Sequence, residues 1–104
     1  MIKSMNVNEL NEKLGKDTNI FLVDVREQAE WDEAHIDGAT FLPLSQLEAR
    51  FSELPKDKSL ILQCRSGKRS LTAANFLQEN GYDDLTNLEG GILAWIDEGF
   101  DVND

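Results

Sequence analysis

One stretch of sequence decides the fold of this 104-residue chain: Ser59-Leu-Ile-Leu-Gln-Cys64-Arg-Ser-Gly-Lys-Arg69-Ser70. Its apolar run, residues 60–62, leads to the only cysteine, and a short polar loop with three cations follows. From Leu71 to Leu77 the apolar residues recur at helical spacing. The pattern predicts a buried strand that ends at Cys64 and a helix that begins a few residues later. A helix N-terminus offers unpaired backbone N–H groups and a partial positive charge, which suit an anion such as a thiolate.

Charge is distributed unevenly along the chain. The sequence holds 20 Asp and Glu against 10 Lys and Arg, a net charge of −10. Residues 58–78 nevertheless contain no acid, and they include Lys58, Arg65, Lys68 and Arg69. A positive environment lowers the pKa of a cysteine, which is about 8.5 for a free thiol. A lone cysteine at a strand end is often only a small buried hydrophobe. Here the flanking glycine, the cations and the missing acids favour a reactive thiol.

Strand and helix patterns alternate on both sides of this stretch. Apolar runs predict strands at Ile2–Met5, at Ile20–Val23 and at Leu85–Leu88. Helical patterns separate these runs. The first begins at Asn6 or Asn8 and ends at about Leu14, and the second runs from Gln28 to Ala34. The others run from Ser45, a candidate cap, to about Phe51, from the cysteine loop to about Asn80, and from Gly91 toward Gly99. The alternation predicts an α/β domain with a mostly parallel central sheet. Ligands of such sheets bind at the carboxyl ends of the strands. Cys64 is expected there, and so are residues 24–27 if their two strands are neighbours.

Length and composition limit the classes of function. A chain of this length is expected to form one domain, residues 1–104. No stretch approaches the roughly 20 apolar residues of a membrane span, and the N-terminus lacks the apolar centre of a secretory signal. One Cys and one His allow neither a disulfide within the chain nor a structural zinc site, so we expect no metal and no cofactor. These features suit a reducing cytoplasm. The acidic balance argues against nucleic acid and anionic membranes as partners.

Four stretches resemble, in the right order, the signatures of rhodanese domains, and single-domain sulfurtransferases in particular. They are Leu22-Val-Asp24-Val-Arg26-Glu27 for the first strand, Glu30–Ala39 followed by Pro43 for the Gly-His-Ile-x-Gly-Ala…Pro segment, Cys64–Arg69 for the active-site loop, and Leu88–Trp95 for the Gly-Gly…Trp segment. In family members the second of these leads into a short strand, here about residues 40–42. The sequence departs from the family pattern at Ala34, where glycine is usual, and at Phe41, where asparagine is frequent.

The resemblance implies a single rhodanese-like domain with helices on both faces of the sheet and a thiosulfate sulfurtransferase-like activity. In that reaction the Cys64 thiolate takes a sulfane sulfur from a small anionic donor such as thiosulfate and forms a persulfide. The sulfur then passes to cyanide or a thiol, a protein acceptor included, by double displacement. The loop expected to bind the anion comprises Arg65, Ser66, Gly67, Lys68, Arg69 and Ser70.

The residue types suggest a role for each part of the loop. Gly67 allows a tight turn, and backbone N–H groups of residues 65–69 can stabilise negative charge beside the sulfur. Lys68 and Arg69 can hold an anionic donor, Arg69 in bidentate fashion. Two supporting residues precede the loop in sequence. Asp24 is expected to accept backbone N–H bonds at a buried strand end. Arg26 is expected to pair with an acid such as Glu30, or else to reach the pocket.

Two other functions compete with this interpretation. A cysteine phosphatase also uses a Cys…Arg loop at a helix N-terminus, but the loop of that class holds seven residues and the loop from Cys64 to Arg69 holds six. A rhodanese module that only binds a partner, or relays sulfur within an assembly, is the other alternative. Non-catalytic modules of this kind typically lose the cysteine, which is present here. His35, the lone histidine, is expected to be a hydrogen-bonded structural residue more than a general base.

Overall fold

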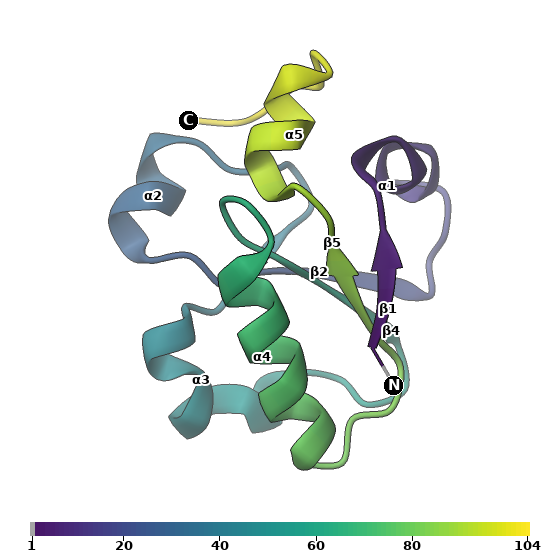
Figure 1. Ribbon diagram of the computed structural model, residues 1–104, viewed down its shortest axis with the longest axis vertical. Coiled ribbons are helices and arrows are strands. Elements are labelled where there is room, and N and C mark those ends of the chain that lie inside the picture. Colours follow the sequence, from purple (N-terminus) through teal and green to yellow (C-terminus); the bar gives the residue numbers. More distant parts are fainter. Residues whose placement is uncertain (1) are drawn as a thin grey trace.

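Five parallel strands form one sheet at the centre of the computed structural model, which describes residues 2–104 (Figure 1). The strands are β1 (Ile2–Met5), β2 (Ile20–Asp24), β3 (Thr40–Phe41), β4 (Ser59–Gln63) and β5 (Leu85–Leu88). Their order across the sheet is β1-β5-β4-β2-β3, and every adjacent pair is parallel. The strand that leads to Cys64 therefore lies in the middle of the sheet, as the apolar run of the sequence predicts.

Helices cover both faces of this sheet, so the predicted α/β architecture is confirmed. They are α1 (Val7–Lys13), α2 (Gln28–Glu33), α3 (Leu44–Arg50), the 3-10 turn η1 (Phe51–Glu53), α4 (Lys68–Glu79) and α5 (Gly91–Asp97). Alternate residues of the strands feed two hydrophobic clusters. Val23 packs with residues of α3 and α4, whereas its neighbour Leu22 packs with residues of α1 and α5. No helix within residues 2–104 is both long and apolar enough to cross a bilayer.

The register of the sheet brings the functional segments to one edge. Asp24 at the end of β2 is the register partner of Gln63 at the end of β4. The segments that follow these two residues, 25–27 and 64–67, therefore leave the sheet side by side. This edge is the carboxyl end of the strands, where open parallel sheets bind their ligands.

Two helix starts can be compared with their predicted caps. Asn6 caps α1, because its side chain accepts the backbone N–H of Glu9 at 2.9 Å. The predicted cap of α3 is wrong: this helix begins at Leu44 and Pro43 is the capping residue. Ser45 lies in the first turn, where its hydroxyl donates to Glu27 at 2.7 Å. This hydrogen bond connects the first turn of α3 to Glu27 at the start of α2.

The C-terminal tail packs against the segment between α2 and β3. His35 and Asn103 exchange two backbone hydrogen bonds of 2.8 Å each. The Trp95 indole donates to the Asp101 carbonyl at 2.8 Å. These contacts give structure to a polar tail whose sequence predicts no element.

Candidate active site

The six-residue loop from Cys64 to Arg69 follows β4 and includes the first two residues of α4. Cys64 is almost entirely buried, with 1% of the residue exposed. Gly67 caps α4 with a φ of +105°, a left-handed conformation that favours glycine. Its backbone N–H donates to the Cys64 sulfur at 3.1 Å. The tight turn predicted from the glycine is therefore present, and it aims one of the free N–H groups of the helix start at the thiol.

Hydrogen bonds around the sulfur favour its ionised form. Burial alone raises the pKa of Cys64, because it removes water from the thiolate. Hydrogen bonds from the Ser70 side chain and from the backbone of Ser70, Gly67 and Ser66 outweigh that effect, so that the pKa of Cys64 lies below its usual value. The Ser70 hydroxyl lies 3.4 Å from the sulfur. The loop thus makes the thiol more acidic through short-range donors.

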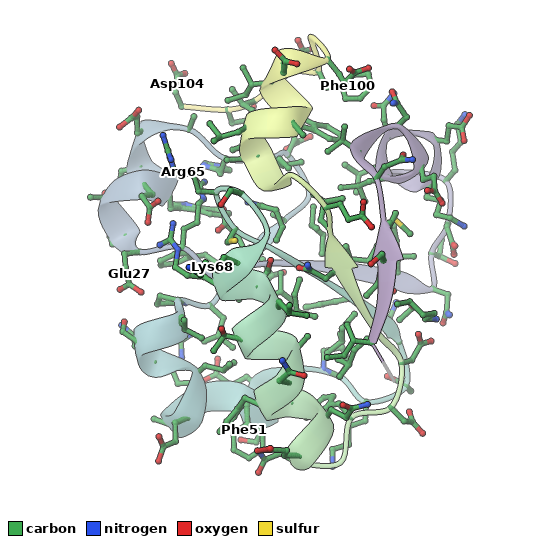
Figure 2. The ribbon with its side chains drawn as sticks, viewed as in Figure 1. Glu27, Phe51, Arg65, Lys68, Phe100 and Asp104 are labelled. Carbon is green, nitrogen blue, oxygen red and sulfur yellow. The ribbon has the colours of Figure 1, made fainter. Side chains whose placement is uncertain are left out.

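The three loop cations have different surroundings. Arg69 forms a bidentate ion pair with Glu30 of α2, with nitrogen–oxygen distances of 2.7 and 2.8 Å. Arg65 and Lys68 are exposed and form no ion pair with any residue that the structure describes. Both extend on the α2 side of the loop (Figure 2). Two cations are therefore free to meet an anion, while the bidentate partner of Arg69 is a carboxylate of the protein itself.

Asp24 and Arg26 form a buried pair beside the loop. Asp24 accepts the backbone N–H of Arg26 at 2.9 Å, which agrees with the expected use of its carboxylate. The guanidinium binds the same carboxylate at 2.8 Å and donates to the Ala34 carbonyl at 2.6 Å. Arg26 therefore pairs with an acid, as expected, but that acid is Asp24. Glu30, which the sequence analysis offers as an example, binds Arg69 instead. Arg26 joins the end of β2 to the end of α2.

The start of α5 supports the loop from outside, a role for which the sequence analysis named no residue. The backbone N–H groups of Ile92 and Leu93 donate to the carbonyls of Cys64 and Arg65, at 2.9 and 3.1 Å. Only a glycine fits at position 91, where φ is +56° and a Cβ would meet both carbonyl oxygens closer than any real contact. The N-terminal N–H groups of α5 thus hold the carbonyl side of the loop.

Two amide side chains complete the surroundings of Cys64. Asn87 of β5 donates from Nδ2 to the Gly67 carbonyl at 3.1 Å and accepts the Ser70 hydroxyl on Oδ1 at 2.5 Å. Gln63 donates to the Cys64 carbonyl at 2.8 Å. Sequence reasoning passed over both residues. Gln63 adjoins Cys64 in the chain, but Asn87 becomes its neighbour only because β5 lies next to β4 in the sheet.

His35 is structural, as the sequence analysis favours. Its Nδ1 lies 2.9 Å from the Trp31 carbonyl oxygen, which can only accept, so Nδ1 carries the hydrogen. The imidazole also stacks on the Trp31 ring, with 3.7 Å between the ring centroids. Within residues 2–104 no group of three His, Cys, Asp or Glu side chains is arranged to hold a metal ion.

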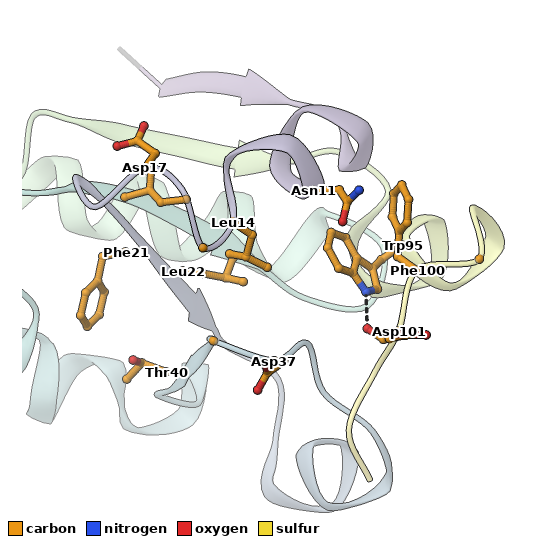
Figure 3. Close-up of a pocket in the computed structure, with 14 residues that line it drawn as sticks. Asn11, Leu14, Asp17, Phe21, Leu22, Asp37, Thr40, Trp95, Phe100 and Asp101 are labelled. Carbon is orange, nitrogen blue, oxygen red and sulfur yellow. Dashed lines mark hydrogen bonds between the residues drawn. The ribbon is translucent and has the colours of Figure 1, made fainter.

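A groove of about 580 Å³ lies away from the thiol, and Cys64 is not part of its lining (Figure 3). The ends of α1 and α5 and the first residues of β2 form its walls. Asp17, Asp37 and Asp101 line it together with Trp95. The single cysteine of the sequence therefore lies outside this groove.

Comparison with known proteins agrees with this geometry. The family described as the Rhodanese-like domain matches residues 6–98. A sulfurtransferase of Allochromatium vinosum is 36% identical over 102 residues, which cover 98% of this chain and 95% of the relative. Thiosulfate sulfurtransferase GlpE of Shewanella oneidensis is 33% identical over 89% of this chain and 91% of its own length. The crystal structure of a rhodanese-related protein from Thermoplasma volcanium has a TM-score of 0.87 at 33% identity, with 97% of both chains covered. The chain therefore belongs to the rhodanese-like domain family, as its four signatures predict.

Proposed function

We propose that this protein is a sulfurtransferase in which Cys64 carries a sulfane sulfur from a small anionic donor to a thiol or cyanide acceptor. Membership of the rhodanese-like family and the sulfurtransferase homologues support a sulfurtransferase or sulfur-carrier role. Because the GlpE relative is named a thiosulfate sulfurtransferase, thiosulfate is the first donor to test. One observation carries the proposal: the loop aims the Gly67 N–H at the Cys64 sulfur, 3.1 Å away.

The proposed reaction consists of two displacements. In the first, the Cys64 thiolate attacks the outer sulfur of thiosulfate, a new sulfur–sulfur bond forms, and sulfite leaves with the electron pair of the broken bond. In the second, cyanide or a thiolate attacks the outer sulfur of the persulfide, and the Cys64 thiolate is released. Negative charge remains beside the sulfur throughout. The fixed N–H donors of the loop stabilise that charge without having to reorganise.

Each loop cation has a distinct role in this proposal. Arg65 and Lys68 attract the donor, because both are exposed and neither is paired with an acid in the part of the chain that the structure describes. Arg69 adds positive charge near the sulfur but is held by Glu30. The proposal assigns no separate general base, because the hydrogen bonds of the loop lower the pKa of Cys64 and so make its thiolate easier to form. A free reactive thiol suits a reducing compartment, so we propose a cytoplasmic site of action.

Intact-mass measurement tests the proposal directly. Reduced protein is incubated with excess thiosulfate, and a gain of one sulfur atom is expected for the wild type and not for Cys64→Ser. Cyanide or dithiothreitol should remove the added sulfur. If folded, reduced protein gains no sulfur from thiosulfate or from a polysulfide donor, the proposed function is wrong. Hydrolysis of an aryl phosphate that depends on Cys64 would then favour the phosphatase alternative.

A further inference from the structure

The Ser70 hydroxyl has two neighbours that compete for its single hydrogen. One is the Cys64 sulfur, 3.4 Å away, and the other is the Asn87 Oδ1 atom, 2.5 Å away. A serine hydroxyl can donate only once. When Cys64 is a thiol, its own hydrogen can point to the Ser70 oxygen, and all the contacts are satisfied. When Cys64 is a thiolate, both the sulfur and Oδ1 need the same hydrogen.

The orientation of the Asn87 amide is fixed by a second contact. Its Nδ2 donates to the Gly67 carbonyl at 3.1 Å, and a carbonyl oxygen can only accept. Rotating the amide by half a turn would place Oδ1 against that carbonyl, so Oδ1 must face Ser70. Ser70 is fully buried, which excludes water as a substitute partner for its hydroxyl. The competition is therefore built into the packing of β5 against the loop.

We propose that Asn87 is a positioning residue that holds the Ser70 hydroxyl hydrogen away from the Cys64 sulfur and so limits how readily Cys64 ionises. The backbone donors of the loop remain in place in both states, whereas the Ser70 hydroxyl becomes available to the thiolate only at the expense of its bond to Oδ1. A thiolate whose pKa is lowered too far is a weaker nucleophile. Asn87 thereby keeps the thiol closer to the pH at which it attacks best.

Other charged groups near the sulfur do not take part in the competition for the Ser70 hydrogen. The loop carries Arg65 and Lys68, and Arg69 of α4 interacts with the thiolate through its positive charge. Glu27 and Glu30 lie on the α2 side and act on Arg69. β5 contributes no titratable side chain, since its residues are Leu, Thr, Asn and Leu. Substitutions at positions 70 and 87 leave all of these groups in place, so a change in ionisation can be assigned to the hydrogen bonds.

The test is a double-mutant cycle read by the pH profile of Cys64 alkylation with iodoacetamide. Asn87→Leu fills the space of the amide without an acceptor, and it should release the Ser70 hydrogen to the thiolate. A hydrogen bond to a charged group is strong enough to change the thiolate-to-thiol ratio by about tenfold. We therefore expect faster alkylation below neutral pH and a profile that moves to lower pH. In a Ser70→Ala background the same substitution should move the profile very little.

Each other outcome contradicts the proposal. A profile that moves to higher pH in Asn87→Leu would show that the residue mainly holds the Gly67 N–H in place. An equal displacement with and without Ser70 would show that the hydroxyl is not involved. Thr86→Val, on the opposite face of β5, is the matched control and should leave the profile unchanged. Asn87→Ala serves as a second variant if the leucine prevents folding.

The effect of removing the hydroxyl provides a second measurement. The Ser70 side chain lowers the pKa of Cys64, so Ser70→Ala should raise it. Because Asn87 competes for the same hydrogen, the rise should be smaller with Asn87 present than in an Asn87→Leu background, and a rise of equal size in both would contradict the proposal. This inference concerns the cysteine of the proposed function, but alkylation needs no sulfur donor. A failure to load sulfur and a failure of the Asn87 cycle are therefore distinguishable.

Discussion

Replacing Glu30 by glutamine removes one half of the ion pair that ties α2 to the start of α4. The Arg69 guanidinium binds both carboxylate oxygens of Glu30, at 2.7 and 2.8 Å. Glutamine keeps the size of the side chain and, being neutral, approximates the protonated carboxyl. The substitution therefore removes the charge interaction with little change in packing, and its effect can be worked out from the geometry.

The magnitude follows from the acidity of this carboxyl. The Arg69 hydrogen bond outweighs partial burial and, together with the Glu27 N–H bond and the charges of Arg69 and Arg26, lowers the pKa of Glu30 from 4.5 to about 2. If the unfolded chain keeps the ordinary value, the pKa of Glu30 differs by about 2.5 between the unfolded and folded chain, which corresponds to about 3.4 kcal/mol of stability at neutral pH. The two side chains are 34% and 30% exposed, so solvent and salt screen the pair. We expect a loss of about 1–2 kcal/mol in the free energy of unfolding.

The pH dependence of this loss has a definite sign. Because the pKa of Glu30 is lower in the folded chain, its stabilisation is complete above about pH 4.5 and disappears as the pH falls through about 2. The difference between the wild type and Glu30→Gln should therefore be constant near neutral pH and approach zero in acid. Urea unfolding followed by circular dichroism at about pH 7, 4 and 2.5 measures it.

The control is Glu33→Gln, which changes an exposed acid on the same helix that forms no ion pair among the described residues. It should leave the stability nearly unchanged, whereas Glu30→Gln should lower the Tm by about 5–15 °C at neutral pH. A loss below about 0.5 kcal/mol, or a loss of equal size at pH 7 and in acid, would refute the reasoning.

Three further predictions concern other parts of the site. Gly91→Ala should lower the free energy of unfolding by about 2 kcal/mol or more and slow sulfur loading, because a Cβ would press against the loop carbonyls at a φ of +56°. Urea unfolding measures the stability and intact mass measures the loading, and wild-type values in both would contradict this prediction. Arg65→Ala and Lys68→Ala should each raise the KM for thiosulfate severalfold and leave the Tm nearly unchanged, and an unchanged KM in both would exclude them as donor-binding residues. Asp24→Asn should cost about 3–5 kcal/mol in urea unfolding, because it leaves the buried Arg26 without its carboxylate; a cost below about 1 kcal/mol would show that the pair is dispensable.

Much of this site can be predicted from local sequence. The apolar run before Cys64 and the helical spacing after it define the strand and the helix, and Gly67 marks the turn between them. These signals are local because each depends on residues within a few positions of one another. They are sufficient to predict a thiol at a helix start, and the structure contains one.

The remaining features depend on contacts between distant segments. Arg69 and Glu30 are 39 positions apart. The sequence alone does not show that the Arg69 guanidinium binds this carboxylate of the protein and is not left free for an anionic donor. Asn87 meets Ser70 across 17 positions because β5 lies beside β4, and an alternation of strands and helices does not fix the order of strands in a sheet. The predicted cap of α3 is wrong for a similar reason, since the side-chain partner of Ser45 is Glu27, 18 positions away.

The support that α5 gives to the loop has a consequence for the order in which the molecule matures. Protein chains are synthesised from the N-terminus, and small domains complete their folding only when all the packed segments are available. The N–H groups that hold the Cys64 and Arg65 carbonyls belong to Ile92 and Leu93, near the C-terminal end of the sequence. A growing chain that has already exposed Cys64 therefore still lacks the groups that shape its loop. The carbonyl side of the Cys64 loop therefore reaches its final shape only after residues 91–93 have been synthesised and α5 has packed against it.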